Sequence, residues 1–110
     1  MNTAARKIAA CIATLGLMAA AGAHAETPWQ AEHPRRAEVN ERLASQNYRI
    51  DRDVARGKIS PREGAYLHRE DRAIRGEERS MAAANGGSIT RGEQRALNRQ
   101  ENAVSRQIRG

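Results

Sequence analysis

The sequence predicts an all-α protein, a small antiparallel bundle of three helices joined by two short turns. Apolar residues recur at the spacing of one helical face along three segments. Glycine followed by a helix-capping pattern interrupts these segments twice, and the two interruptions are 30 residues apart. Phe is absent and Cys occurs once, so we expect one small domain with a thin core. This composition argues against a multidomain enzyme and a disulfide scaffold.

Residues 1–25 are interpreted as a cleaved signal peptide. Arg6 and Lys7 precede an uncharged apolar stretch that ends in an Ala-x-Ala cleavage pattern at residue 25. This stretch is shorter than the ~20 residues that span a bilayer, so no membrane span is expected after cleavage. Cys11 lies inside the stretch and too close to Lys7 for a lipoprotein signal. The sequence therefore predicts secretion into the periplasm without a lipid anchor.

The mature chain is predicted to begin with an extended leader over residues 26–33, which contains Pro28 and is followed directly by Pro34. A three-helix domain is predicted over residues 34–110, and its first helix covers residues 34–55. Apolar side chains fall on one face of that helix, at Val39, Leu43, Ile50 and Val54.

The second and third helices are predicted over residues 60–84 and 90–108. In each turn a glycine ends one helix, and a Ser or Thr with Glu three residues later forms a capping box for the next. The structural turn residues are therefore Gly57, Ser60, Glu63, Gly87, Thr90 and Glu93. The apolar positions of these helices are Leu67, Ile74, Met81, Leu97, Val104 and Ile108. Because the two turns match, the bundle is interpreted as a repeated helix–turn–helix unit whose middle helix belongs to both copies.

Polar residues occupy the slots between the apolar positions. They come in adjacent pairs: Gln46 and Asn47, Glu70 and Asp71, Glu77 and Glu78, and Gln100 and Glu101. Burying unpaired groups of this kind costs several kcal/mol. Either the helices touch along a narrow seam and these groups stay in water, or a second copy of the chain completes the seam as a homodimer.

Each turn also resembles the second half of an EF-hand loop, in which a glycine bends the chain and a final glutamate binds calcium. In the first turn, the positions that supply carboxylates in an EF-hand hold Arg52, Val54 and Arg56. A degenerate calcium-binding module is therefore kept as an alternative function, although we expect no metal. His68 stands near Glu70 and Asp71, but no nucleophile–His–acid pattern or phosphate loop accompanies it. We expect neither an enzyme nor a cofactor.

The positive charge comes almost entirely from arginine. The formal net charge is +6, and removal of Arg6 and Lys7 with the signal leaves +4. Acids interleave with the arginines, and Glu38/Arg42 and Asp71/Arg75 have the spacing of helical ion pairs, so a solvated ion-pair network is expected. Export makes nucleic acid an unexpected partner. An anionic envelope surface, such as lipopolysaccharide or phospholipid headgroups, or an acidic protein segment fits better.

Two resemblances add to this interpretation. The segment ITRGEQRAL resembles the LTxxQ segment of the Spy/CpxP family of periplasmic stress proteins. That resemblance implies an exported helical protein that binds unfolded clients or tunes an envelope-stress sensor. The segments HPRRAEVNERLASQNYRI, LHREDRAIRGEERSMAAANGGSIT and EQRALNRQENAVSRQI resemble a group of small secreted proteobacterial proteins, which implies compartment and fold but no mechanism.

The function expected from the sequence is non-enzymatic binding of other proteins in the periplasm, in an envelope-stress or chaperone-like role. Apolar contact would come from Leu67, Ile74 and Met81, and the arginines would attract acidic partners. The candidate partner-binding arginines are Arg72, Arg75 and Arg79. Binding to an anionic envelope surface is the other alternative function.

Overall fold

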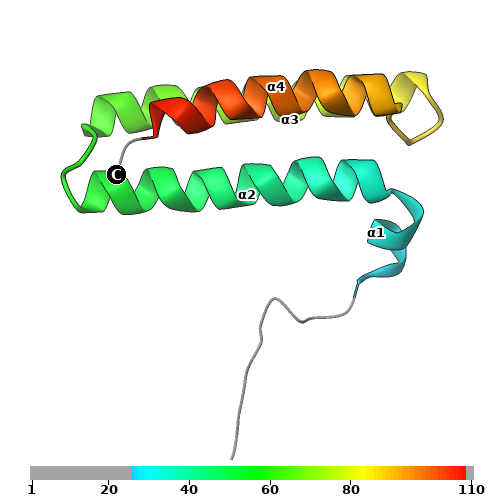
Figure 1. Ribbon diagram of the computed structural model, residues 1–110, viewed down its shortest axis with the longest axis horizontal. Helices are drawn as coiled ribbons and strands as arrows, with labels where there is room; N and C mark the ends of the chain where they lie inside the picture. Colours follow the sequence, from blue (N-terminus) through cyan, green and yellow to red (C-terminus); the bar gives the residue numbers. More distant parts are fainter. Residues whose placement is uncertain (1–25, 109–110) are drawn as a thin grey trace, which may run out of the picture. The chain divides into compact units, whose positions relative to one another are not determined.

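A computed structural model describes residues 26–108, and within this range the chain forms helices and no strands. The predicted all-α class is confirmed. The helices are α1 (Pro28–Glu32), α2 (Pro34–Ala55), α3 (Pro61–Ala84) and α4 (Arg91–Gln107), as labelled in Figure 1. The expected signal peptide, including Cys11, lies outside the described residues, as do residues 109–110.

Helix α1 lies where the sequence predicted an extended leader, and that prediction is wrong. The Gln30 backbone N–H donates to Thr27 Oγ1 (3.1 Å), and the Thr27 backbone N–H donates to Gln30 Oε1 (2.8 Å). This reciprocal pair is a capping box, and Pro28 provides a backbone already suited to the first helical turn. The prediction failed because it did not treat Thr27 and Gln30 as a cap.

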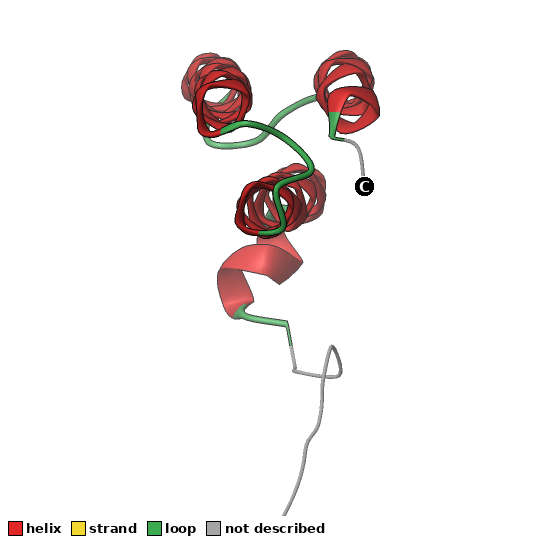
Figure 2. Ribbon diagram, turned by 90° about the vertical axis from the view of Figure 1, so that its left-hand side faces the viewer, coloured by secondary structure: helices red, strands yellow, loops and turns green. Residues whose placement is uncertain are grey.

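The three long helices α2, α3 and α4 each contact the other two. Viewed end-on, they stand at the corners of a triangle (Figure 2). Short turns make α3 antiparallel to both α2 and α4 (Figure 1). The buried apolar residues that these helices and the second turn contribute are Val39, Leu43, Ile50, Leu67, Ile74, Ala82, Ile89, Leu97, Val104 and Ile108.

Both turns close the preceding helix in the same way. The Lys58 N–H donates to the Asp53 carbonyl (2.8 Å), and the Gly87 N–H donates to the Ala82 carbonyl (2.7 Å). Each bond spans five residues and satisfies a carbonyl of the last helical turn. The residue before each donor is a glycine with positive φ, Gly57 at +75° and Gly86 at +69°, and Gly87 itself has φ +103°, all in a region that favours glycine.

Side-chain caps fix the starts of α3 and α4. At α4 the capping box is complete, because Thr90 Oγ1 accepts from the Glu93 N–H (3.1 Å) and Glu93 Oε1 accepts from the Thr90 N–H (2.8 Å). At α3, Ser60 Oγ accepts from the Glu63 N–H (3.0 Å). Among the residues described, only α4 of these two helices completes the reciprocal bond, so the expected box at Ser60 is half formed.

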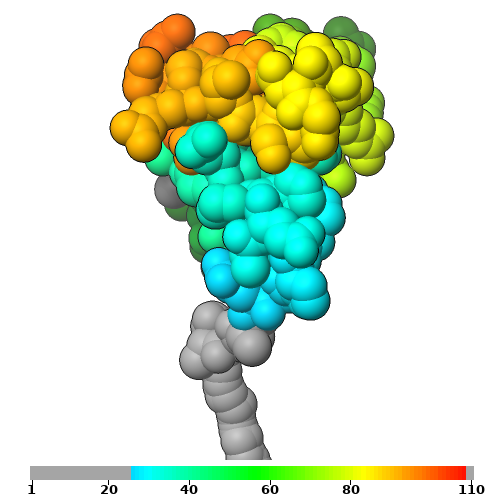
Figure 3. Space-filling view, turned by 90° about the vertical axis from the view of Figure 1, so that its right-hand side faces the viewer, coloured from blue at the N-terminus to red at the C-terminus, as the bar shows by residue number. Residues whose placement is uncertain are grey.

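Two arginines of α2 hold the second turn. Arg35 Nε donates to the Ile89 carbonyl (2.8 Å), and Arg36 Nη1 donates to the Gly87 carbonyl (3.0 Å). Figure 3 shows this end of the bundle, where the turn (yellow) and the start of α4 (orange) lie beside the start of α2 (cyan). These bonds satisfy carbonyl groups of the turn and tie it to the first turns of α2.

Candidate functional site

The apolar stripe predicted to contact a partner lies in the core of the chain itself. Leu67 is fully buried, Ile74 is 2% exposed, and Met81 is partly buried against the same core. Helix α3 packs against both α2 and α4, so its apolar stripe faces inward. The prediction that Leu67, Ile74 and Met81 form a partner-binding surface is therefore corrected, because α2 and α4 already cover them.

The three arginines predicted to attract partners are exposed on α3. Arg75 Nε lies 3.7 Å from Glu78 Oε1. The expected ion pair between Asp71 and Arg75 does not form, because Asp71 is turned into the core. The other predicted helical pair, Glu38 with Arg42, is present and also hydrogen-bonded.

One member of each adjacent polar pair is turned into the core. The inward members are Gln46 (5% exposed), Asp71 (2%), Glu78 (0%) and Glu101 (0%). Of their neighbours, Glu77 is exposed, whereas Asn47, Glu70 and Gln100 are half-buried. The expectation that all of these groups stay in water is wrong for the four inward members, which the chain's own helices cover. Asp53 (1% exposed) is a further buried carboxylate, three positions after the core residue Ile50 and so on the same helical face.

Glu78 is held by an ion pair across the bundle. Arg36 Nε donates to Glu78 Oε2 (2.6 Å). The other carboxylate oxygen, Oε1, accepts no hydrogen bond within the described part of the chain. Arg75 is a second cation near Oε1, at 3.7 Å and beyond hydrogen-bond distance, so this buried carboxylate depends mainly on Arg36.

Glu101 lies among other acids at the centre of the bundle. Burial raises the pKa of Glu101 to about 8, and the nearby charges of Glu38, Asp71 and Glu78 add to the rise while Arg42 opposes it. Glu101 is therefore mostly protonated at neutral pH. Its backbone carbonyl accepts from Gln46 Nε2 (2.6 Å), so α2 and α4 also bond at this position.

Two further carboxylates show how the surroundings decide the charge. Burial raises the pKa of Asp71 to about 6, while the charge of His68 opposes the rise and that of Glu70 adds to it. Burial also acts to raise the pKa of Glu38, but hydrogen bonds from Gln94 and Arg42 outweigh it, so this pKa lies below its ordinary value. At neutral pH, Glu38 is ionised next to a neutral Glu101.

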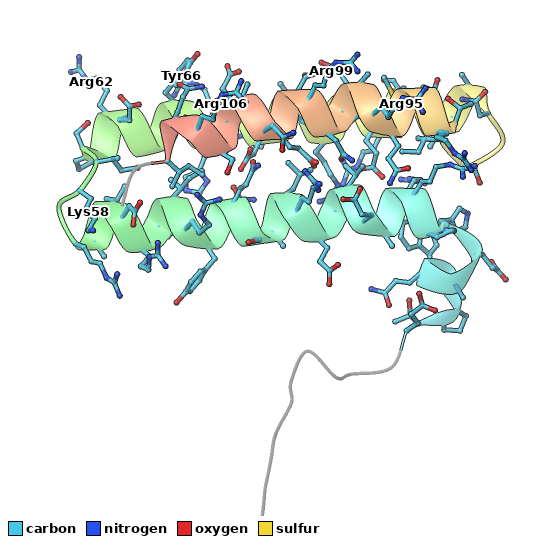
Figure 4. All side chains as sticks on the ribbon, viewed as in Figure 1. Lys58, Arg62, Tyr66, Arg95, Arg99 and Arg106 are labelled. Atoms are coloured by element: carbon cyan, nitrogen blue, oxygen red, sulfur yellow. The ribbon has the colours of Figure 1, made fainter. Side chains whose placement is uncertain are left out.

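Burial of acids leaves arginines unpaired on one side of the molecule. We call the set Arg62, Tyr66, Arg95, Arg99 and Arg106 the basic face. Figure 4 shows these residues on α3 and α4, on the side away from α2. Among residues 26–108, none of the four arginines in this set lies within ion-pair distance of a carboxylate. The expected network of solvated ion pairs is therefore incomplete on this side.

His68 faces α2 and not its sequence neighbours Glu70 and Asp71. Its Nδ1 lies 2.8 Å from Asn47 Oδ1, and its Nε2 lies 2.7 Å from Asp51 Oδ1. Within the described range, no group of three His, Cys, Asp or Glu side chains is placed to hold a metal ion. The contacts of His68 join α2 to α3.

The glutamate that would bind calcium in the EF-hand interpretation is engaged elsewhere in the second turn. Glu93 accepts from the Thr90 N–H, and both of its carboxylate oxygens accept from Asn85 Nδ2, at 3.0 and 3.2 Å. These bonds serve the helix start and the preceding turn.

No helix within the described residues is both long and apolar enough to cross a membrane. No protein-family model, curated protein or solved structure matches the chain. The function of this chain is therefore inferred from its residues and their geometry.

Proposed function

We propose that this chain is a non-enzymatic binding protein that recognises acidic segments of other proteins through its basic face. The observation that carries the proposal is the row Arg95, Arg99 and Arg106. These residues are exposed at i, i+4 and i+11 on α4, without a carboxylate partner in the described chain. Guanidinium groups form two parallel hydrogen bonds with a carboxylate, so a row of them suits an acidic peptide.

An acidic partner suits this surface better than an apolar, unfolded client. The apolar stripe at Leu67 and Ile74 is enclosed, so a chaperone that used it would first have to open its own core. Tyr66 is 44% exposed, and the Arg69 guanidinium lies 6.0 Å from the centre of its ring. The exposed aromatic area next to the arginines is thus small and already contacts a cation.

We also propose that the chain folds as a single-chain bundle built from a repeated helix–turn–helix unit and that it is exported. The polar core groups are covered by one chain, which supports a single-chain antiparallel bundle over the homodimer. The left-handed glycine and Ser/Thr cap of each turn support a repeated helix–turn–helix unit. The Ala-x-Ala signal pattern supports export to the periplasm, where acidic proteins are available as partners.

The test is the binding of a fluorescent poly-glutamate peptide to the chain beginning at Glu26, followed by anisotropy at low and physiological salt. We expect salt-sensitive binding that the triple variant R95Q/R99Q/R106Q weakens by at least about tenfold. The matched control, R72Q/R75Q/R79Q, removes the same charge from α3 and should change the affinity far less.

Two outcomes would contradict this assignment. An equal loss in both triple variants would show that net charge, and not the basic face, attracts the peptide. Stronger binding to anionic lipid vesicles or lipopolysaccharide than to the peptide would favour the envelope-surface alternative. At the second turn, no contact among residues 26–108 favours the calcium-binding alternative, because Glu93 is engaged in capping.

A further inference from the structure

A second cationic site lies in an open groove between α2 and α4, apart from the basic face. The groove has a volume of about 210 Å³. The residues that line it are polar in type: Arg42, Ser45, Gln46, Arg49, Asn102 and Ser105. No carboxylate lines the groove. Arg42 is paired with Glu38 beside it, whereas Arg49 has no ion pair among the described residues, so the groove is suited to an anion.

Both arginines are held across the groove by α4. Arg42 Nη1 donates to Asn102 Oδ1 (3.1 Å), and Arg49 Nη1 donates to Ser105 Oγ (2.9 Å). Arg42 Nε donates to Glu38, which leaves its second terminal nitrogen free of any hydrogen bond to the described residues. A guanidinium carries five N–H donors, so each arginine is positioned by one or two bonds and keeps others for a ligand.

The remaining lining groups also offer donors. Ser105 Oγ accepts from Arg49, so its own O–H can donate toward the groove. The Asn102 amide accepts through its oxygen and keeps its two N–H groups. The Ser45 hydroxyl has no hydrogen-bond partner among residues 26–108. Donors from both helices therefore surround the groove.

Gln46 joins the two helices beside the groove. Its Nε2 donates to the Glu101 carbonyl (2.6 Å). Its Oε1 is buried and accepts no hydrogen bond within the described chain, so a ligand in the groove does not reach it.

We propose that this groove binds a phosphate group, either as inorganic phosphate or as a phosphate monoester. Arg42 and Arg49 donate to its charged oxygens, and Ser45, Ser105 and Asn102 provide further donors. The groove holds a tetrahedral oxyanion at its open side, so a monoester extends into solvent. The proposal is independent of the basic face, which lies elsewhere on α3 and α4.

The test is a ¹⁵N NMR titration of the chain beginning at Glu26 with three probes at constant ionic strength. The probes are inorganic phosphate, glycerol 3-phosphate, and phosphatidylcholine vesicles that contain phosphatidic acid. We expect saturable shifts of the backbone signals of Ser45, Arg49, Asn102 and Ser105. Saturation with soluble phosphate identifies a site for free phosphates, and line broadening with vesicles alone identifies a lipid headgroup site; either result supports the groove.

The variant R49Q should lower the phosphate affinity by about tenfold, the expected effect of losing one charge-assisted contact. R72Q removes an equal charge from an exposed position of α3 outside both sites and should leave the affinity unchanged. Because R49Q also loses its bond to Ser105, S45A serves as a second variant that leaves every described hydrogen bond intact and should weaken binding a few-fold. Equal shifts with chloride, unchanged affinity in both groove variants, or an equal loss in R72Q would each overturn the proposal.

Discussion

Glu101 shows how a single buried side chain makes the stability of this bundle depend on pH. Its folded-state pKa of about 8 lies above the ordinary value of 4.5, because burial disfavours its charged form. The folded state favours the protonated carboxyl of Glu101, so the stability that this group contributes is fully present below the pKa it has in the unfolded chain. That contribution is lost as the pH rises through the folded pKa. The free energy of unfolding therefore falls as the pH rises from about 4.5 to about 8.

We predict that Glu101→Gln removes most of this dependence. The glutamine is neutral at every pH, so the free energy of unfolding at pH 8 should rise relative to the native chain, on the order of 4 kcal/mol. At pH 4.5 the two proteins should be nearly equal. Urea denaturation followed by circular dichroism across this range measures the difference.

The control for this prediction is Glu41→Gln, which removes an exposed carboxylate from α2. Its stability should follow that of the native chain at every pH. If Glu101→Gln also retains the native pH profile, Glu101 is ionised in the folded state and the argument from its burial fails.

The ion pair between Arg36 and Glu78 supports a second prediction at this scale. Arg36→Met removes the hydrogen-bonded cation of the buried Glu78 and leaves only Arg75, at 3.7 Å, so the free energy of unfolding should fall by about 3 kcal/mol. Adding Glu78→Gln removes the buried charge and should recover most of that loss. A double-mutant cycle by urea denaturation at pH 7 measures the coupling.

The comparison for this cycle is Arg79→Met, an exposed arginine one residue from Glu78. It should change stability by less than about 0.5 kcal/mol. A cycle with no coupling would mean that Arg36 stabilises the protein only through its other contacts, including the Gly87 carbonyl.

At the scale of the element, Gly64 of α3 lies directly against side chains of α2. A Cβ atom at Gly64 would lie 2.6 Å from Val54 Cγ2 and 3.5 Å from Ile50 Cγ2. We predict that Gly64→Ala lowers the free energy of unfolding by about 1–3 kcal/mol, because the two helices must move apart. Thermal denaturation measures the change.

Gly76 provides a matched control within the same helix. A Cβ atom at Gly76 would meet nothing within 4 Å, so Gly76→Ala should raise stability by about 0.5–1 kcal/mol through helix propensity alone. If both substitutions stabilised α3 equally, the close approach of α2 and α3 at Gly64 would be refuted.

The helices could be predicted from the sequence because local signals define their ends. Ser60 and Thr90 act as caps at the expected places, and Gly57 and Gly87 take the left-handed conformation that ends a helix. Helix α1 was missed because its cap was not recognised. Local hydrogen bonds of this kind depend on a few neighbouring residues and can be read from the sequence.

The burial of the polar slots could not be predicted with the same reasoning. Asp71 and Glu78 each follow an apolar core residue by four positions, which is the spacing of a core site. Their polar character suggested exposure, but the packing of three helices decides which residue of each pair turns inward. The groove residues escaped prediction for a similar reason, because they meet only when α2 and α4 lie side by side.

At the scale of the whole molecule, positive and negative groups are separated by depth. Four carboxylates lie in the core, at Asp53, Asp71, Glu78 and Glu101, while the arginines of the basic face stay exposed. A formal sum of charges treats these groups as equal contributors, although a protonated Glu101 adds no negative charge at pH 7. The surface that a partner meets is thus more positive than the sequence total indicates.

The position of Glu101 also couples folding to the solvent. An unfolded chain at neutral pH carries this carboxyl in its ionised form, whereas the folded chain carries it mostly protonated. Folding therefore takes up close to one proton from the surrounding solution through this group, and each opening of the core returns it. The bundle exchanges a proton with its buffer whenever it forms or opens.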